Sequence, residues 1–118
     1  MAIKKSNKKV NLRVDRSRNV ILTATIGNAQ IGASVVRFKG SSNVLAKGEI
    51  KKCNLGIGSS LVGKKLVVIS NILDSNDLTN GVVVTYFFEA CTPLVTTFND
   101  RVDNDGDIFS YIVEFTFV

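Results

Sequence analysis

The side chains that most often carry out catalysis are scarce in this sequence. Its 118 residues contain no histidine and only two cysteines, Cys53 and Cys91. Pairs of serine or cysteine with histidine are therefore impossible within the chain, and so are zinc sites that need histidine or four cysteines. Acid-base chemistry would need paired carboxylates held at a fixed distance, but the acidic residues gather in turns. We therefore expect no enzymatic activity, no cofactor and no small-molecule substrate.

The densest group of acidic residues surrounds Gly106, where oxygen ligands for calcium stand close together in the sequence. Its members are Asp103, Asp105 and Asp107. Aligned on Gly106, the helix-loop-helix calcium motif would need an acidic residue at Arg101 and a glutamate at Ile112, so that motif is excluded. An Asp-Gly pair before an alternating strand is typical of a hairpin. We interpret the segment as a solvated turn, with a calcium site shared with Asp74 and Asp77 as the alternative.

Residues 58–65, Gly-Ser-Ser-Leu-Val-Gly-Lys-Lys, match the spacing of a phosphate-binding P-loop as far as its lysine. Lys65, however, occupies the position of the hydroxyl residue that contacts Mg²⁺. Residues 66–69 are Leu-Val-Val-Ile, which predicts a strand where a P-loop needs the N-terminus of a helix. We therefore interpret residues 54–63 as a loop or a single helical turn whose glycines supply special backbone torsions.

Basic residues cluster near the N-terminus, and clustered cations favour contacts with phosphate groups. The cluster comprises Lys4, Lys5, Lys8, Lys9, Arg13, Arg16 and Arg18. Proteins that bind single strands place aromatic side chains among such cations, but Phe38 is the only aromatic residue before Tyr86. The cluster therefore indicates, at most, binding of an anion or a nucleic acid through phosphate contacts, and a solvated basic tail is the simpler interpretation.

The net charge of +5 conceals an uneven distribution along the chain. Residues 1–65 have a net charge of +12, whereas residues 66–118 have a net charge of −7. Such asymmetry favours either an acidic partner or ordered self-association between oppositely charged surfaces. The alternative is that folding brings the two halves side by side, so that the charges interleave.

Apolar and polar residues alternate with a period of two along most of the chain, and no segment has the spacing of an amphipathic helix. Glycine, asparagine, aspartate and serine cluster between the alternating segments and mark turns. The expected strands are residues 10–15, 20–26, 34–39, 44–53 with a bulge at Gly48, 64–73, 82–90, 94–98 and 109–117. We expect the strands at 64–73 and 82–90 to be neighbours, because only a short segment with turn signals separates them.

The C-terminal strand has the clearest pattern. One face carries Phe109, Tyr111, Val113, Phe115 and Phe117, while the other is mostly polar. Short strands without a recurring helix predict an all-β fold, a two-sheet antiparallel β-sandwich of about seven or eight strands, with a small β-barrel as second choice. We expect residues 1–8 to form a basic, flexible N-terminal tail and residues 9–118 to form a single β-sandwich domain.

The basic N-terminus lacks the apolar run of a secretory signal, and no apolar stretch is long enough for a membrane helix. We therefore expect a cytoplasmic protein with free thiols at both cysteines and no membrane association. Three features together predict a non-catalytic structural or protein-interaction module. They are the scarcity of catalytic side chains, the uneven distribution of charge along the chain and the open edges of a sandwich. We expect it to be a homo-oligomer, a self-associating component of a larger assembly. The alternative is an anion or nucleic-acid binding module that uses the basic N-terminal half.

Overall fold

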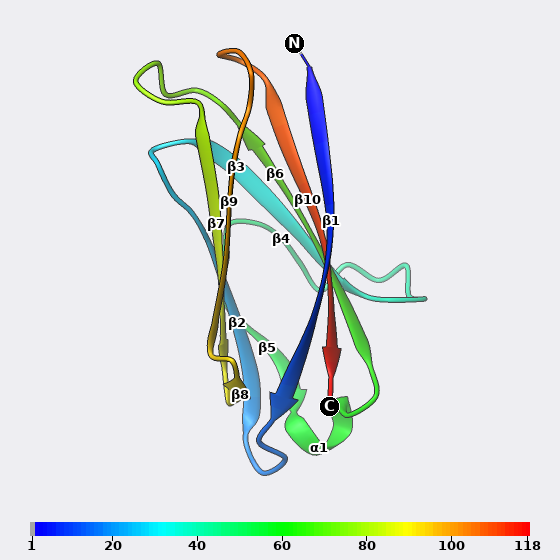
Figure 1. Ribbon diagram of the computed structural model, residues 1–118. Coiled ribbons are helices and arrows are strands. Elements are labelled where there is room, and N and C mark those ends of the chain that lie inside the picture. The colour runs from blue at the N-terminus through cyan, green and yellow to red at the C-terminus, as the bar shows by residue number, and fades with distance from the viewer. Residues whose placement is uncertain (1) are drawn as a thin grey trace.

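The computed structural model describes residues 2–118 and shows two β-sheets packed face to face as a sandwich (Figure 1). Its elements are β1 Ile3–Val14, β2 Asn19–Ile26, β3 Ile31–Phe38, β4 Ala46–Gly48, β5 Ile50–Ile57, α1 Gly58–Leu61, β6 Lys65–Leu73, β7 Gly81–Glu89, β8 Cys91–Thr92, β9 Val95–Arg101 and β10 Ile108–Phe117. The six-stranded sheet has the order β4-β3-β6-β10-β1-β8, and the four-stranded sheet has the order β5-β2-β7-β9. The predicted β-sandwich is confirmed.

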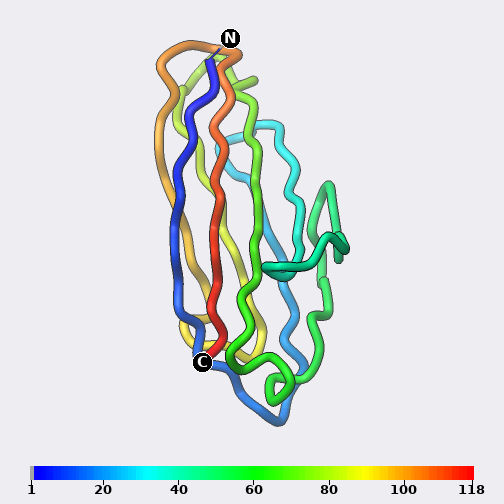
Figure 2. Tube along the Cα trace, turned by 90° about the vertical axis from the view of Figure 1, so that its right-hand side faces the viewer, coloured from blue at the N-terminus to red at the C-terminus, as the bar shows by residue number. Residues whose placement is uncertain are grey.

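The first and last strands lie side by side and run parallel, whereas the other strand pairs are antiparallel. The parallel pairing of β1 with β10 extends from Ile3 opposite Ile108 to Leu12 opposite Phe117. Figure 2 looks onto the six-stranded sheet, where β1 and β10 appear as adjacent blue and red strands. A purely antiparallel sandwich was expected, so this pair is a difference from the prediction.

The N-terminal segment also differs from the prediction. Residues 3–8, which we expected to be a flexible tail, form the first half of β1 because β10 supplies their backbone hydrogen-bond partners. Met1 of the predicted tail lies outside the described residues. The second edge of β1 meets a strand only at Arg13 and Val14, which pair with β8, within the part of the chain that the structure describes. Lysines along such an edge discourage the addition of further strands.

The strands β6 and β7 were predicted to be neighbours, and this prediction is wrong. β6 lies between β3 and β10 in one sheet, whereas β7 lies between β2 and β9 in the other. The connecting segment therefore crosses from one layer of the sandwich to the other. A short connection with turn residues is compatible with both arrangements, so it does not by itself identify a hairpin.

Residues 44–53, predicted as one strand with a bulge at Gly48, form parts of two strands in different sheets. β4 pairs with β3 at the edge of the six-stranded sheet, and β5 pairs with β2 at the edge of the four-stranded sheet. Gly48 stands at the change of sheet with a φ of +90°, a torsion that favours glycine. The chain thus closes one side of the sandwich by switching layers.

The glycine-rich segment contains α1, whose four residues are the only helix within residues 2–118. Gly58 packs so closely against the backbone of Asp15 that a Cβ atom would overlap the Asp15 carbonyl group. β6 begins four residues after α1 ends, so no long helix faces the loop as a P-loop requires. No helix in the described chain is long and apolar enough to cross a membrane.

The core lies between the sheets and is built from alternate residues of each strand. Phe115 is fully buried, with its ring centroid 5.3 Å from that of Tyr86 and 4.7 Å from that of Phe88. The predicted inward face of the C-terminal strand is therefore confirmed. The polar groups in the core are paired: the Ser70 hydroxyl lies 2.7 Å from both the Ser34 hydroxyl and the Tyr86 hydroxyl. These hydrogen bonds join the two sheets through the core.

Candidate functional site: the outer face of the six-stranded sheet

The outward-facing side chains of β1, β3, β6 and β10 form a surface that we call the outer face. The strand register aligns four apolar residues in a row across these strands: Ile3, Ile108, Leu73 and Ile31. Ile3 is 58% exposed and Ile31 is 64% exposed, so this row lies in solvent. An apolar row that spans four strands differs from the isolated exposed side chains found on most surfaces.

A second apolar row lies further along the same strands. Ile112 of β10 is opposite Ile69 of β6, which is opposite Val35 of β3, and all three are half-buried. Val67 lies next to this row and is covered by longer side chains. Two hollows of about 440 and 480 Å³ flank Ile112 on this face. The outer face therefore offers recesses into which an apolar side chain of a partner can fit.

Basic side chains surround these apolar rows. Lys5, Lys9, Arg37 and Lys65 occupy outward positions on three of the four strands. Within the described residues, Glu114 is the only acidic residue at an outward position of the four strands. The outer face thus carries two apolar rows with a mostly polar row between them, formed by Lys5, Ser110, Asn71 and Ala33, and its positive charges lie beside these rows.

Glu114 is enclosed by cations. Its carboxylate accepts a hydrogen bond from Lys39 Nζ at 2.7 Å and lies 4.0 Å from Lys9 Nζ. The hydrogen bond from Lys39 lowers the pKa of Glu114, and the positive charges of Lys39, Lys65 and Lys9 lower it further against a smaller effect of burial. One carboxylate therefore offsets only part of the positive charge on this face.

Replacing Glu114 with glutamine should reduce stability in a pH-dependent way. Because the folded-state pKa of Glu114 is lowered, its ionised form stabilises the fold above the unfolded-state pKa. That contribution is lost as the pH falls through the folded-state pKa. The Tm difference between wild type and Glu114→Gln should therefore be largest near neutral pH and shrink as the pH falls below the ordinary glutamate pKa of about 4.3.

The control for this experiment is Glu49→Gln, which removes a carboxylate from an ion pair with Lys51 that is exposed on both sides. Its Tm should stay close to that of the wild type across the pH range. A Tm difference for Glu114→Gln that does not change with pH would show that the charge of Glu114 is not what stabilises the fold.

The structure divides the basic cluster predicted near the N-terminus. Lys5 and Lys9 lie on the outer face, whereas Lys4 forms an ion pair with Asp103 at 3.2 Å and Lys8 lies 5.5 Å above the Phe98 ring. The remaining members, Arg13, Arg16 and Arg18, lie at the far end of β1 and in the turn after it. At about 3.3 Å per residue, Lys4 and Arg13 are about 30 Å apart. The seven residues therefore do not form one compact anion site.

The three calcium candidates have separate partners. Asp103 pairs with Lys4, and Asp105 lies 2.8 Å from the side-chain amide group of Asn80. Asp107 is buried and accepts hydrogen bonds from the backbone amides of Ala2 and Asn104 at 2.9 and 3.1 Å. The hydrogen bond from Ala2 lowers the pKa of Asp107. Within residues 2–118, no three acidic or other metal-ligating side chains gather around one point.

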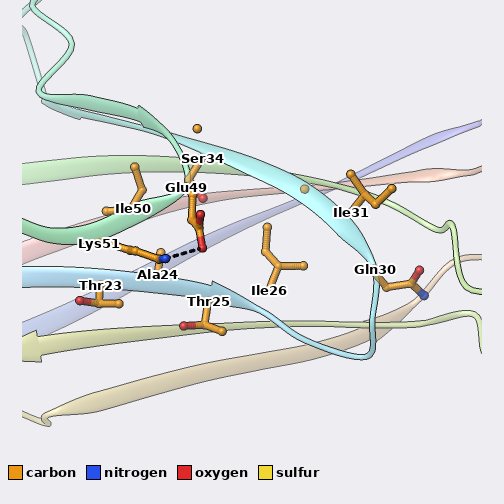
Figure 3. Close-up of a pocket in the computed structure, with 12 residues that line it drawn as sticks. Thr23, Ala24, Thr25, Ile26, Gln30, Ile31, Ser34, Glu49, Ile50 and Lys51 are labelled. Carbon is orange, nitrogen blue, oxygen red and sulfur yellow. Dashed lines mark ion pairs between the residues drawn. The ribbon is translucent and has the colours of Figure 1, made fainter.

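A cleft of about 360 Å³ opens between the sheets where the chain passes from β4 to β5 (Figure 3). β2 beyond Ala24 lacks a partner in β5, and β3 before Ser34 lacks a partner in β4, so unpaired strand edges line the cleft in the described chain. Its charged side chains, Glu49 and Lys51, pair with each other at 3.4 Å and are exposed. The cleft therefore holds no pair of groups suited to acid-base catalysis.

The potential nucleophiles are poorly activated. Both cysteines are free, and burial raises the pKa of Cys91 to about 11 and also raises the pKa of Cys53. A thiol with a raised pKa is a weak nucleophile at neutral pH, because the thiolate is the reactive form. Burial likewise raises the pKa of Tyr86 to about 12, against a smaller opposing effect of its hydrogen bond to Ser70. These groups serve packing in the core.

The sequence analysis missed the outer face, although the sequence contains a signal for it. The segment 66–69 is apolar at every position, so both faces of β6 had to be apolar. Ile108 and Ile112 are likewise apolar residues on the otherwise polar face of β10. Local alternation does not reveal that these residues belong together, because strand order brings them into one row.

Comparison of the chain with protein-family models, with curated proteins and with solved structures finds no match. Function is therefore inferred from the geometry of this molecule alone.

Proposed function

We propose that the protein is a non-catalytic interaction module that associates with copies of itself through the outer face of its six-stranded sheet. The observation that supports this proposal is the alignment of two apolar rows across β1, β3, β6 and β10 within a surround of basic side chains. Exposed apolar side chains bordered by polar ones are typical of protein-protein interfaces.

The strand edges of the sandwich are less suited to self-association than the outer face is. The six-stranded sheet ends in β4 and β8, which have three and two residues. The long free edge of β1 carries lysines, and β5 is irregular in its pairing with β2. Short, charged and irregular edges are the features by which proteins avoid edge-to-edge association. The apolar rows of the outer face lack such protection.

Self-association should be visible in solution. We expect light scattering coupled to size-exclusion chromatography to show a mass that rises above 12.8 kDa as the concentration increases from low to high micromolar. The variant Ile69→Lys adds a charge at the centre of the outer face and should remain a monomer. Its control, Val44→Lys, adds the same charge at an exposed position between β3 and β4 and should behave as the wild type does. A wild-type monomer at every concentration would contradict the proposal.

The second candidate function is binding of a nucleic acid or another polyanion, which the basic residues of the outer face favour. The aromatic residues of the described chain lie outside the outward positions of this face, so binding would depend on phosphate contacts. Fluorescence anisotropy with labelled RNA and DNA tests this candidate. Two results together would contradict self-association and favour polyanion binding as the function. The protein alone would stay monomeric, and its affinity for the nucleic acid would fall steeply as the salt concentration rises.

A further inference from the structure

The end of the sandwich at which β1 begins carries an acidic tip with one prominent apolar side chain. The tip consists of Asp77 and Leu78 in the β6–β7 loop and of Asp103 and Asp105 in the β9–β10 loop. These two loops lie together at the top of Figure 1. Leu78 is 93% exposed, the largest exposure among the large hydrophobic side chains of residues 2–118. Burial of this leucine against a partner would be favourable.

Buried hydrogen bonds hold the tip in one shape. The side-chain nitrogen of Gln30 donates to Asp74 Oδ1 at 2.7 Å and to the Gly81 carbonyl at 3.0 Å. Its side-chain oxygen accepts from the backbone amides of Ser75 and Asn76 at 2.8 and 2.9 Å. A loop that is ordered before binding loses less entropy when it docks. Leu78 therefore lies on a loop that is already ordered before a partner binds.

The two loops of the tip are joined to each other. When the Asn80 amide is oriented so that its nitrogen faces the two carboxylates, it donates to Asp74 Oδ2 at 2.7 Å and to Asp105 Oδ1 at 2.8 Å. Asn80 therefore links the β6–β7 loop to the β9–β10 loop. The negatively charged side chains of both loops lie at the same end of the molecule.

The charges of the tip and of the outer face are complementary. The tip exposes Asp77, Asp103 and Asp105 beside an apolar side chain, with Lys4 offsetting the charge of Asp103, whereas the outer face presents the exposed Lys5 and the half-buried Arg37 beside apolar hollows. Two outer faces placed against each other would bring like charges together, which opposes a symmetric contact. The attraction of unlike charges favours contact between the tip of one copy and the face of another.

From this complementarity we infer that the acidic tip of one copy docks on the outer face of the next, with Leu78 seated in the hollows that flank Ile112. This inference rests on the proposed function and names the surface of the second copy that the face binds. The basic side chains around the hollows lie against the aspartates of the tip. Because the two surfaces differ, the contact is heterologous, and a pair of copies keeps one free tip at one end and one free face at the other. The assembly grows head to tail into a filament or closes into a ring.

Two variants, each defective in one surface, test the docking. The tip variant is Asp77→Lys with Leu78→Ser, and the face variant is Lys5→Glu with Arg37→Glu. Each variant alone should weaken self-association about tenfold or more, as the loss of a central apolar and charged contact does in other interfaces. An equimolar mixture should form a 1:1 heterodimer, because the intact tip of the face variant fits the intact face of the tip variant.

Light scattering and analytical ultracentrifugation of each variant and of the mixture measure these states, and melting curves confirm that the variants are folded. Leu94→Ser is the control, because Leu94 is an exposed leucine near the opposite end of the sandwich. If the wild type never associates, the proposed function fails. If the wild type and the tip variant associate equally, or if the mixture forms no heterodimer, self-association stands and docking of the tip is overturned.

Discussion

The substitution Phe115→Ala should lower the free energy of unfolding by about 3–5 kcal/mol, the usual loss for a fully buried phenylalanine. Phe115 has no exposed surface and packs between the rings of Tyr86 and Phe88 at the centre of the core. Truncation removes these contacts and leaves a cavity that neighbouring aromatic rings fill poorly. A domain is held by roughly 5–15 kcal/mol, so much of its stability is lost. Chemical denaturation followed by tyrosine fluorescence measures the change.

Thr116→Ala is the matched control on the opposite face of the same strand. Thr116 is half-buried and faces outward, so its truncation should have a much smaller effect on the free energy of unfolding than that of Phe115. A soluble Phe115→Ala variant with wild-type stability and lost self-association would contradict the assignment of Phe115 to the core. It would show instead that the aromatic row takes part in the assembly.

The substitution Gln30→Ala should have the second largest effect, a loss of about 2–4 kcal/mol. The Gln30 side chain is buried. Its nitrogen donates hydrogen bonds to the Asp74 carboxylate and to the Gly81 carbonyl, and its oxygen accepts hydrogen bonds from two backbone amides. Its removal leaves the buried carboxylate of Asp74 with fewer donors and leaves the amides of Ser75 and Asn76 without their acceptor. Buried polar groups without partners are more costly than the mean value of a hydrogen bond.

Ser75→Ala is the control for this experiment, because it lies in the same loop and keeps the backbone amide that Gln30 accepts from. Its stability should be close to that of the wild type. Hydrogen exchange gives a second measurement: in Gln30→Ala the amides of residues 75 and 76 should exchange faster, while those of β10 should stay protected. Unchanged exchange at residues 75 and 76 would show that Gln30 does not hold the loop.

Local alternation was sufficient to predict the strands with one buried and one exposed face. β10 was predicted from 109–117 and is found at Ile108–Phe117, because its inward residues are all large and apolar. The first half of β1 was missed for the opposite reason. Lys4, Ser6 and Lys8 occupy the positions that alternate with its outward residues, but they lie along the open side of the sandwich, where polar side chains are tolerated.

Contacts between distant parts of the chain were beyond the reach of local patterns. Two features depend on which strands pair with each other: the sheets to which β6 and β7 belong, and the parallel pairing of β1 with β10. The residue pattern within a single strand does not determine its partner. The same limit applies to the candidate site. The basic cluster was visible in the sequence, but its division between two faces of β1 follows from the strand register and from the position of Asp103.

The parallel arrangement of β1 and β10 has a mechanical consequence. Ile3 lies at one end of the paired segment and Phe117 at the other, so a pull on the two ends of the chain acts along the strands in opposite directions (Figure 1). Such a load shears the whole set of hydrogen bonds between the strands at once, whereas a load at a hairpin opens its bonds one after another. Resistance to tension applied at the two ends of the chain therefore comes from the hydrogen bonds between β1 and β10.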